Sequence, residues 1–254
     1  MSAIWSIAKR DFQGYFVSAK ASAIFWFFLI FMGFFFYSFV FTFIELQQRA
    51  PMMGGEAPSL DQLLRAIFDN LHFILLLIVP AVTMASFAEE RRTHAFRLLQ
   101  TAPVSGLEIV LGKFLACLGV LGLVLACSTV YPLFTIKYGN PDIGPILTSY
   151  LGVFLLMSMQ IAIGLWVSSM TKNQFMAFLF TMFALFLLLI LNWIAPNLAA
   201  SGPMEGFIKY LATTTHLDSL LKGLLTVSDV VYFLCAISLF LFFTNVVIDS
   251  QRWR

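Results

Sequence analysis

The sequence predicts an all-α protein that crosses a membrane several times. Of its 254 residues, 60% are hydrophobic, 16% are aromatic and only 11% are charged, which is more apolar surface than a water-soluble fold of this size can bury. Six largely uncharged runs recur, most of them near the ~20 residues that a helix needs to cross a ~30 Å hydrocarbon core. Long continuous runs indicate helices and not the strands of a barrel, because a helix satisfies its own backbone groups in lipid. The whole chain, 1–254, is expected to form a single membrane domain.

The expected spans have approximate bounds of 23–44, 73–87, 113–136, 149–170, 174–195 and 230–248. Pro80 in the second span and Pro132 near the outer end of the third each remove a backbone hydrogen bond, so both are expected to kink their helices. The first run has a longer apolar core than a signal peptide and no small-residue cleavage site after it. We therefore expect it to remain in the mature chain as a span.

The segment before the first span, 1–22, is expected to form an amphipathic helix in the membrane interface. Aromatic and apolar residues recur there at helical spacing with charged residues between them. The residues expected to seat this helix are Trp5, Lys9, Arg10, Phe12 and Tyr15. The alternative is a simple solubilising cap at the N-terminus.

The distribution of Lys and Arg predicts the orientation of the spans. Ten of the fifteen basic residues fall on the side that holds both termini and the loops between spans 2 and 3 and between spans 4 and 5. The other five lie among eight of the thirteen acidic residues. The positive-inside rule therefore places both termini in the cytoplasm. Because topology explains the basic excess, no nucleic-acid partner is expected.

Two longer connections, 45–70 and 196–229, are expected on the opposite side. The first opens with turn formers and continues into a short helix over 60–67, for which Ser59 is a suitable N-cap. The second is expected to hold short helices that lie on or dip into the outer leaflet. The three cysteines all lie in apolar runs without paired spacing, so they are expected to be free.

The sequence offers no ATP site of its own. The nearest approach to a phosphate-binding loop is GLEIVLGKF, in which five residues separate Gly106 from Gly112 where the loop needs four. Phe114 also stands where Ser or Thr must reach Mg²⁺. If ATP drives this protein, another chain binds it, so the chain is expected to be neither an enzyme nor a cofactor-binding subunit.

Glu89, Glu90 and His94 raise the alternative of a membrane metal hydrolase. Glu90 and His94 are one helical turn apart, but catalytic zinc needs about three protein ligands. His72 and His216 are expected on the opposite membrane face, so no catalytic, cofactor or metal residue is assigned. No acidic or basic residue is expected deep in any span, which disfavours a proton-driven carrier.

Three passages carry a family resemblance. The opening, SIAKRDFQGYFVSAKASAIFWFFLIFMGFFF, and the terminal region, HLDSLLKGLLTVSDVVYFLCAISLFLFFTNVVIDSQRW, are similar to permease subunits of ABC-2 type transporters, and particularly to the gliding-motility-associated branch. The central passage, EERRTHAFRLLQTAPVSGLEIVLGKF, resembles the family segment E-x-(R/K)-x-x-G-T-x-x-x-L-L-x-T-x-P-(V/I) followed by G-K. Thr93 and His94 replace the usual Gly-Thr-like pair. The central matches are Glu90, Arg91, Arg92, Leu98, Leu99, Thr101, Pro103, Val104, Gly112 and Lys113. The terminal matches are His216, Ser219, Gly223, Asp229, Tyr232, Arg252 and Trp253.

The resemblance implies a six-helix ABC-2 (type V exporter-like) transmembrane domain in a prokaryotic cytoplasmic (inner) membrane. A second copy or a related permease would complete the membrane unit, and two ABC ATPase subunits would bind ATP and Mg beneath it. The segment 89–106 would form a cytoplasmic coupling helix. The residues assigned to ATPase coupling are Glu89, Glu90, Arg91, Arg92 and Arg97. For Arg91 and Arg92, the alternative is that they only flank a span on its positive side.

The leading hypothesis is a transporter permease that exports or mechanically handles a hydrophobic, glycolipid-like or envelope-related substrate. An alternative is a non-transporting membrane anchor that relays ATPase motion to an extracytoplasmic auxiliary protein. The metal hydrolase is the third hypothesis. Membrane lipids are expected to contact the chain under each of the three.

Overall fold

The computed structural model describes residues 3–17, 19–53, 57–92, 104–139, 141–194, 210 and 212–252. These ranges are helical, without a strand, which confirms the predicted all-α class. The helices are α1 (Ala3–Val17), α2 (Ala19–Met53), α3 (Leu60–Arg92), α5 (Gly106–Ser128), α6 (Val130–Gly139), α7 (Ile143–Met170), α8 (Gln174–Ile194), α10 (Thr213–Leu221) and α11 (Val227–Arg252).

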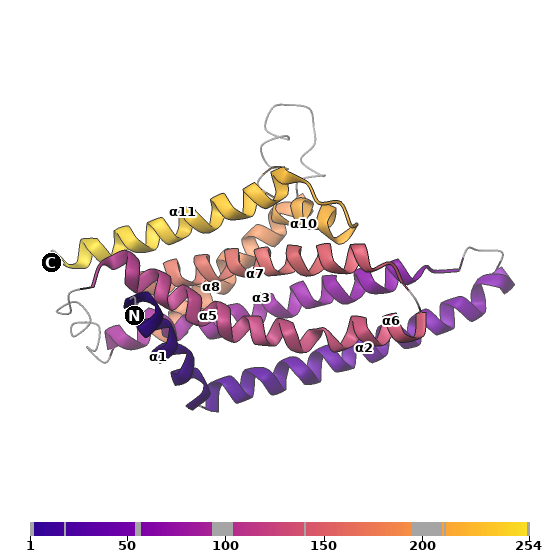
Figure 1. Cartoon of the computed structure of the whole chain (residues 1–254), viewed down its shortest axis with the longest axis horizontal. Coiled ribbons are helices and arrows are strands. Elements are labelled where there is room, and N and C mark those ends of the chain that lie inside the picture. The colour runs from indigo at the N-terminus through magenta and orange to yellow at the C-terminus, as the bar shows by residue number, and fades with distance from the viewer. Residues whose placement is uncertain are drawn as a thin grey trace.

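The long helices run along one axis of the molecule, and α1 crosses the bundle near the end where both termini lie (Figure 1). The end of α3 and the beginning of α5 lie at this same end, which we call the terminal end. The α2–α3 connection lies at the opposite end, the far end. Helix α2 is 35 residues long, or about 52 Å at 1.5 Å per residue, and it extends past the other helices at the far end.

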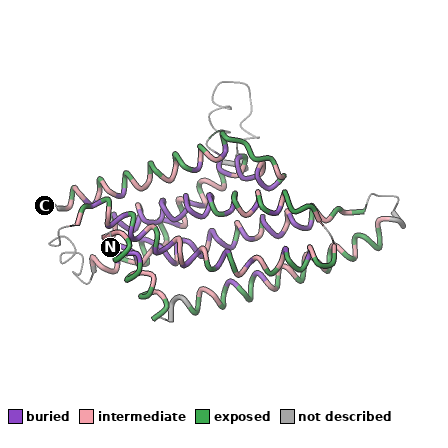
Figure 2. Tube along the Cα trace, in the orientation of Figure 1, coloured by how far each residue is buried: buried purple, intermediate pink, exposed green. Residues whose placement is uncertain are grey.

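Helix α7 forms the centre of the bundle. It packs against α3, α8, α10 and α11, and most of its side chains are buried (Figure 2). Helices α2 and α11 instead leave most of their apolar side chains exposed or half-buried. Such faces suit lipid, which is as apolar as a leucine side chain and does not force them to be buried.

Five helical segments are long and apolar enough to cross a membrane. They are Ser22–Ala50, Leu60–Arg91, Gly106–Gly139, Ile143–Met170 and Val227–Gln251. The apolar part of α8, Gln174–Ile190, is shorter. The structure therefore supports five of the six expected spans by length and composition, and the sixth stays a prediction.

Helix α3 joins two elements that sequence analysis separates. The expected short helix over 60–67 and the expected span 73–87 form one continuous helix, Leu60–Arg92, that passes through Pro80. Its buried face continues from Leu64 through Leu71 to Leu75. The backbone amide of Gln62 contacts Ser59 Oγ at 3.4 Å, which places Ser59 at the start of the helix as expected.

The third span also begins earlier than expected. Ser105 accepts a hydrogen bond from the Glu108 amide at 3.3 Å, and the Glu108 carboxylate accepts one from the Ser105 amide at 2.9 Å. This capping box starts α5 at Gly106 and not at 113. The helix is interrupted at Thr129, whose amide bonds to the Ala126 carbonyl three residues earlier. Pro132 lies just beyond, near the start of α6.

Candidate functional site

The acidic pair assigned to coupling lies in the last turn of α3 at the terminal end. Glu89, Glu90 and Arg91 are half-buried. Arg92 is the last residue of the helix. Arg97 and the rest of 93–103 lie outside the described residues, so this part of the expected coupling helix stays a prediction.

Glu90 points into the protein, where it joins an ion cluster formed by Arg10, Asp11, Glu90 and Lys113. The Lys113 ammonium lies 2.8 Å from Glu90 Oε1 and 3.1 Å from Asp11 Oδ2. It also donates a hydrogen bond of 2.7 Å to the Ser86 carbonyl. With its side chain only 2% exposed, Lys113 is a buried cation whose partners come from two other helices, α1 and α3.

Arg10 completes the ion cluster from the outside. Its guanidinium lies 2.7 Å from Asp11 and 3.1 Å from Glu90. Partial burial disfavours the charge of Arg10, but the carboxylates of Asp11 and Glu90 more than offset this and raise the pKa of Arg10. Two cations thus face two anions. This balance matters because a buried charge is tolerated only when it is paired and hydrogen-bonded.

A layer of neutral polar groups lies beside the ion cluster. The Tyr15 hydroxyl lies 2.8 Å from the Val82 carbonyl, to which it donates, and 3.3 Å from Ser86 Oγ. Cys117 Sγ lies 3.3 Å from the same Ser86 hydroxyl. Burial raises the pKa of Tyr15 well above its ordinary value, so the phenol keeps its proton and remains a donor.

The cluster borders a cavity of about 470 Å³ between α1, α3 and α5. The Lys113 ammonium also lies 5.1 Å from the centre of the Phe87 ring. Among the described residues, no three His, Cys, Asp or Glu side chains gather as metal ligands would.

The other residues at the end of α3 contact two further helices. Glu89 accepts a hydrogen bond of 2.7 Å from Gln174 at the start of α8. Arg91 donates to Gln251 near the end of α11. The last turn of α3 is therefore tied to α1, α5, α8 and α11 by polar contacts.

The residues expected to seat α1 in the membrane interface separate into two groups. Trp5, Lys9 and Arg10 are exposed, as an interfacial position requires. Phe12 and Tyr15 instead face the bundle. The Phe12 ring packs so closely on Gly119 that a Cβ added there would lie only 3.1 Å from the ring, and the Tyr15 hydroxyl bonds to Val82 of α3. Helix α1 is thus docked on α5 along one face and is not only a surface helix.

The burial of Lys113 and its pairing with Asp11 were not predicted from the sequence. Lys113 lies about two turns after the start of α5 and not at the middle of the helix, so the expectation that no charged residue lies deep in a span stays a prediction. The G-K pair in the central passage was the available signal. Asp11 lies 102 residues away from Lys113, so no local pattern connects them.

A second cluster of polar side chains, separate from the ion cluster, joins α10 to α11. His216 Nδ1 lies 2.7 Å from Asp229 Oδ1, and the His216 ring stacks on Tyr232 with ring centres 4.1 Å apart. The Thr226 hydroxyl donates to the other oxygen of Asp229. Three of the residues matched in the terminal passage, His216, Asp229 and Tyr232, therefore hold the short helix α10 against α11.

Comparison with known proteins supports the ABC-2 part of the resemblance. The model of a family described as ABC-2 family transporter protein matches residues 46–215, which is more than half of the chain and includes the end of α3, Lys113 and Gln174. No curated protein matches the chain. The chain belongs to the ABC-2 family of transporter proteins.

Proposed function

We propose that this chain is the permease subunit of an ABC transporter in which a separate cytoplasmic ATPase binds ATP and Mg. Membership of the ABC-2 family supports a permease subunit and, in general, an ABC ATPase partner. The observation that carries the proposal further is the set of contacts around the last turn of α3. This turn leads directly into the segment that resembles the family's coupling region.

The contacts provide a route from the coupling segment to the rest of the bundle. A displacement of the end of α3 cannot occur alone, because Glu90 is held by Lys113 of α5 and by Arg10 of α1. Glu89 and Arg91 extend the same restraint to α8 and α11. Ion pairs in partly buried positions resist separation because each separated charge loses its partner away from water.

This geometry refines the roles of the five coupling residues. Glu90 transmits motion inside the subunit, and Glu89 and Arg91 do so to a smaller extent. Arg92 and Arg97 are the proposed contacts for the ATPase surface. Glu89 and Glu90 thus transmit motion within the permease and do not themselves contact the ATPase.

The assembly and placement follow from the same proposal. Both termini lie in the cytoplasm of a prokaryotic inner membrane, and α8 forms the sixth span. Two permease chains and two ATPase subunits form the complex. The sequence resemblance of the terminal passage supports placement in the gliding-motility-associated branch, and with that branch we propose an envelope-related substrate.

The alternative of a membrane anchor that relays motion to an extracytoplasmic protein has one observation in its favour. Helix α2 extends beyond the rest of the bundle at the far end (Figure 1). The extension carries an ion pair between Arg49 and Glu45 at 3.0 Å on an exposed face. Such a projection could hold a partner without any transported substrate.

The test separates binding of the ATPase from transmission of its motion. The complex is purified in mild detergent, its subunits are identified by mass spectrometry, and ATPase turnover is measured in lipid vesicles. Arg97→Glu should reduce recovery of the ATPase. Glu90→Gln should leave recovery intact but lower the permease-dependent turnover by about tenfold, the effect of losing one charge-assisted contact.

Arg49→Gln at the far end serves as the matched control and should change neither quantity. Recovery of no ATPase at all would overturn the permease proposal. Equal effects of Glu90→Gln and Arg97→Glu on recovery would overturn the division of roles. Recovery of an extracytoplasmic protein with ATP-driven turnover but no transport in vesicles would favour the anchor.

A further inference from the structure

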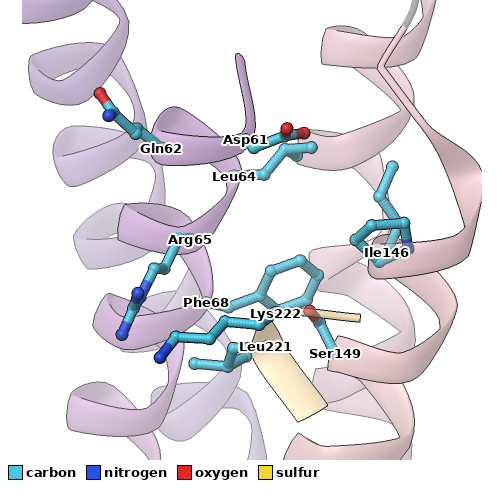
Figure 3. A pocket seen from close by; sticks show the side chains of 10 residues that line it. Asp61, Gln62, Leu64, Arg65, Phe68, Ile146, Ser149, Leu221 and Lys222 are labelled. Carbon is cyan, nitrogen blue, oxygen red and sulfur yellow. The ribbon is translucent and has the colours of Figure 1, made fainter. Parts of the chain in front are cut away.

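A second cavity lies in the outer part of the bundle, toward the far end and away from the ion cluster. It has a volume of about 260 Å³ and opens between the first turns of α3, the first turns of α7 and the end of α10 (Figure 3). We call it the far-end pocket. It lies near the ends of three helices, and the proposed topology places this end of the bundle at the outer surface of the membrane, where lipid headgroups lie.

The pocket has an apolar wall formed by Leu64, Phe68 and Leu221. The hydroxyl of Ser149, a residue only 2% exposed, lies beside that wall and lines the cavity. A pocket of this kind accepts a ligand that is apolar on one side and polar on the other.

Opposite charges line the pocket on different sides. Figure 3 shows the side chains of Arg65 and Lys222 extended toward one side of the cavity, with the Asp61 carboxylate on another. Arg65 is already paired with Asp218 at 2.9 Å. For Lys222 and Asp61, no ion pair is found within the part of the chain that the structure describes.

The size of the pocket limits what enters it. At about 260 Å³ it is slightly smaller than the ~300–1,000 Å³ cavities that enclose drug-sized ligands, so it fits a headgroup but not a whole lipid. Large apolar side chains remain exposed on the neighbouring turns, including Leu147, Leu224 and Leu225. These provide an apolar surface along which acyl chains could lie outside the pocket.

We propose that the far-end pocket binds the zwitterionic headgroup of an aminophospholipid. The phosphate lies toward Lys222, and the primary ammonium donates hydrogen bonds to Asp61. A purely anionic headgroup would leave Asp61 facing a negative charge, which disfavours it. The inference concerns a lipid site and holds whether or not that lipid is transported.

The test measures lipid retention by the purified full chain, without any ATPase. The chain is exchanged into detergent with phosphatidylethanolamine, phosphatidylcholine or phosphatidylglycerol of identical acyl chains, and bound lipid is counted by native mass spectrometry over a concentration series. Phosphatidylethanolamine should bind about three- to tenfold more tightly than phosphatidylcholine, whose methylated nitrogen cannot donate a hydrogen bond to Asp61.

Two variants and a control locate the binding. Asp61→Asn should abolish the preference for phosphatidylethanolamine over phosphatidylcholine. Lys222→Gln should weaken binding of both lipids by about three- to tenfold. Lys137→Gln removes an exposed lysine of α6 that lies near the Tyr138 ring and does not line the pocket, so it should match the wild type.

Equal binding of phosphatidylethanolamine and phosphatidylcholine to the wild type would overturn the proposal. Tighter binding of phosphatidylglycerol would also overturn it, because the site would then select net negative charge. If Lys222→Gln and Lys137→Gln behave alike, the lipid binds elsewhere. None of these outcomes depends on whether an ATPase partner exists, so failure of the lipid site and failure of the proposed function are distinguishable.

Discussion

At the scale of single residues, Lys113 makes the largest electrostatic demand on the fold, because its ammonium is buried and holds two carboxylates from different helices. We predict that Lys113→Met lowers the free energy of unfolding by about 3–5 kcal/mol, because Glu90 and Asp11 lose a buried partner. In thermal unfolding followed by tryptophan fluorescence, this corresponds to a midpoint lower by roughly 6–20 °C.

A double-mutant cycle supplies the control for Lys113. The double variant Lys113→Met, Glu90→Gln should lose less stability than the sum of the losses of the two single variants. In each single variant one buried charge remains without this partner, and in the double variant both charges are removed. Strict additivity would show that the two side chains do not interact in the folded protein. Lys172→Met, in the exposed turn between α7 and α8, should change the midpoint little.

Tyr15 gives a pH dependence with a definite sign. Its folded-state pKa is raised by burial above the ordinary value of 10.0, so its contribution to stability is complete below about pH 10 and is lost as the pH rises through the raised pKa. Tyr15→Phe should cost about 1 kcal/mol at neutral pH. The difference in unfolding midpoint between wild type and Tyr15→Phe should shrink above pH 10. A constant difference would contradict the assignment. The exposed Tyr37→Phe is the control.

At the scale of elements, the docking of α1 on α5 depends on Gly112 and Gly119, which lie seven residues apart on one face of α5. A Cβ added at Gly112 would lie 2.8 Å from the Ile7 side chain and 3.1 Å from the Ile4 carbonyl. Gly112→Leu should therefore displace α1 and destabilise the protein by about 1–3 kcal/mol. The measurement is thermal unfolding together with proteolysis of the N-terminal segment.

Gly122 of the same helix is the matched control. A Cβ there meets no described atom within 4 Å, so Gly122→Leu should be neutral or slightly stabilising through helix propensity. Equal sensitivity of the two positions would show that α1 does not rest on the Gly112 face.

The helices were largely predictable from hydropathy, but their continuity was not. A hydropathy window registers the polar residues Asp69 and Asn70 as an interruption between two elements. In the structure the apolar face that contains Leu71 passes unbroken along α3, so packing decides the outcome. The contacts of Lys113 with Asp11 join residues far apart in the sequence, and single-sequence patterns carry no signal for such a pair.

At the scale of the whole molecule, whether α8 crosses the membrane can be tested by finding on which side of the membrane its flanking loops lie. If α8 crosses the membrane, Lys137 and Lys222 lie outside and Lys172 lies inside. Single cysteines at these three positions, in a background whose native cysteines are replaced by alanine, are treated with an impermeant maleimide in right-side-out vesicles. Positions 137 and 222 should react almost completely, and position 172 only after the membrane is opened.

Labelling of position 222 only after the membrane is opened, as for position 172, would show that α8 returns without crossing. The permease would then cross the membrane five times, an odd number. Its termini would lie on opposite sides, although Figure 1 places them at one end of the bundle.

The ion cluster also sets an order of events during synthesis. Asp11 precedes Lys113 by 102 residues, so at about 5–20 residues per second the helix α1 leaves the ribosome roughly 5–20 s before its buried partner exists. During that interval Asp11 has no ammonium partner from α5, and α1 can contact only α2 and the end of α3, through pairs such as Arg10 with Glu90. Its docking is therefore a late step of biogenesis, completed only after α5 has been inserted.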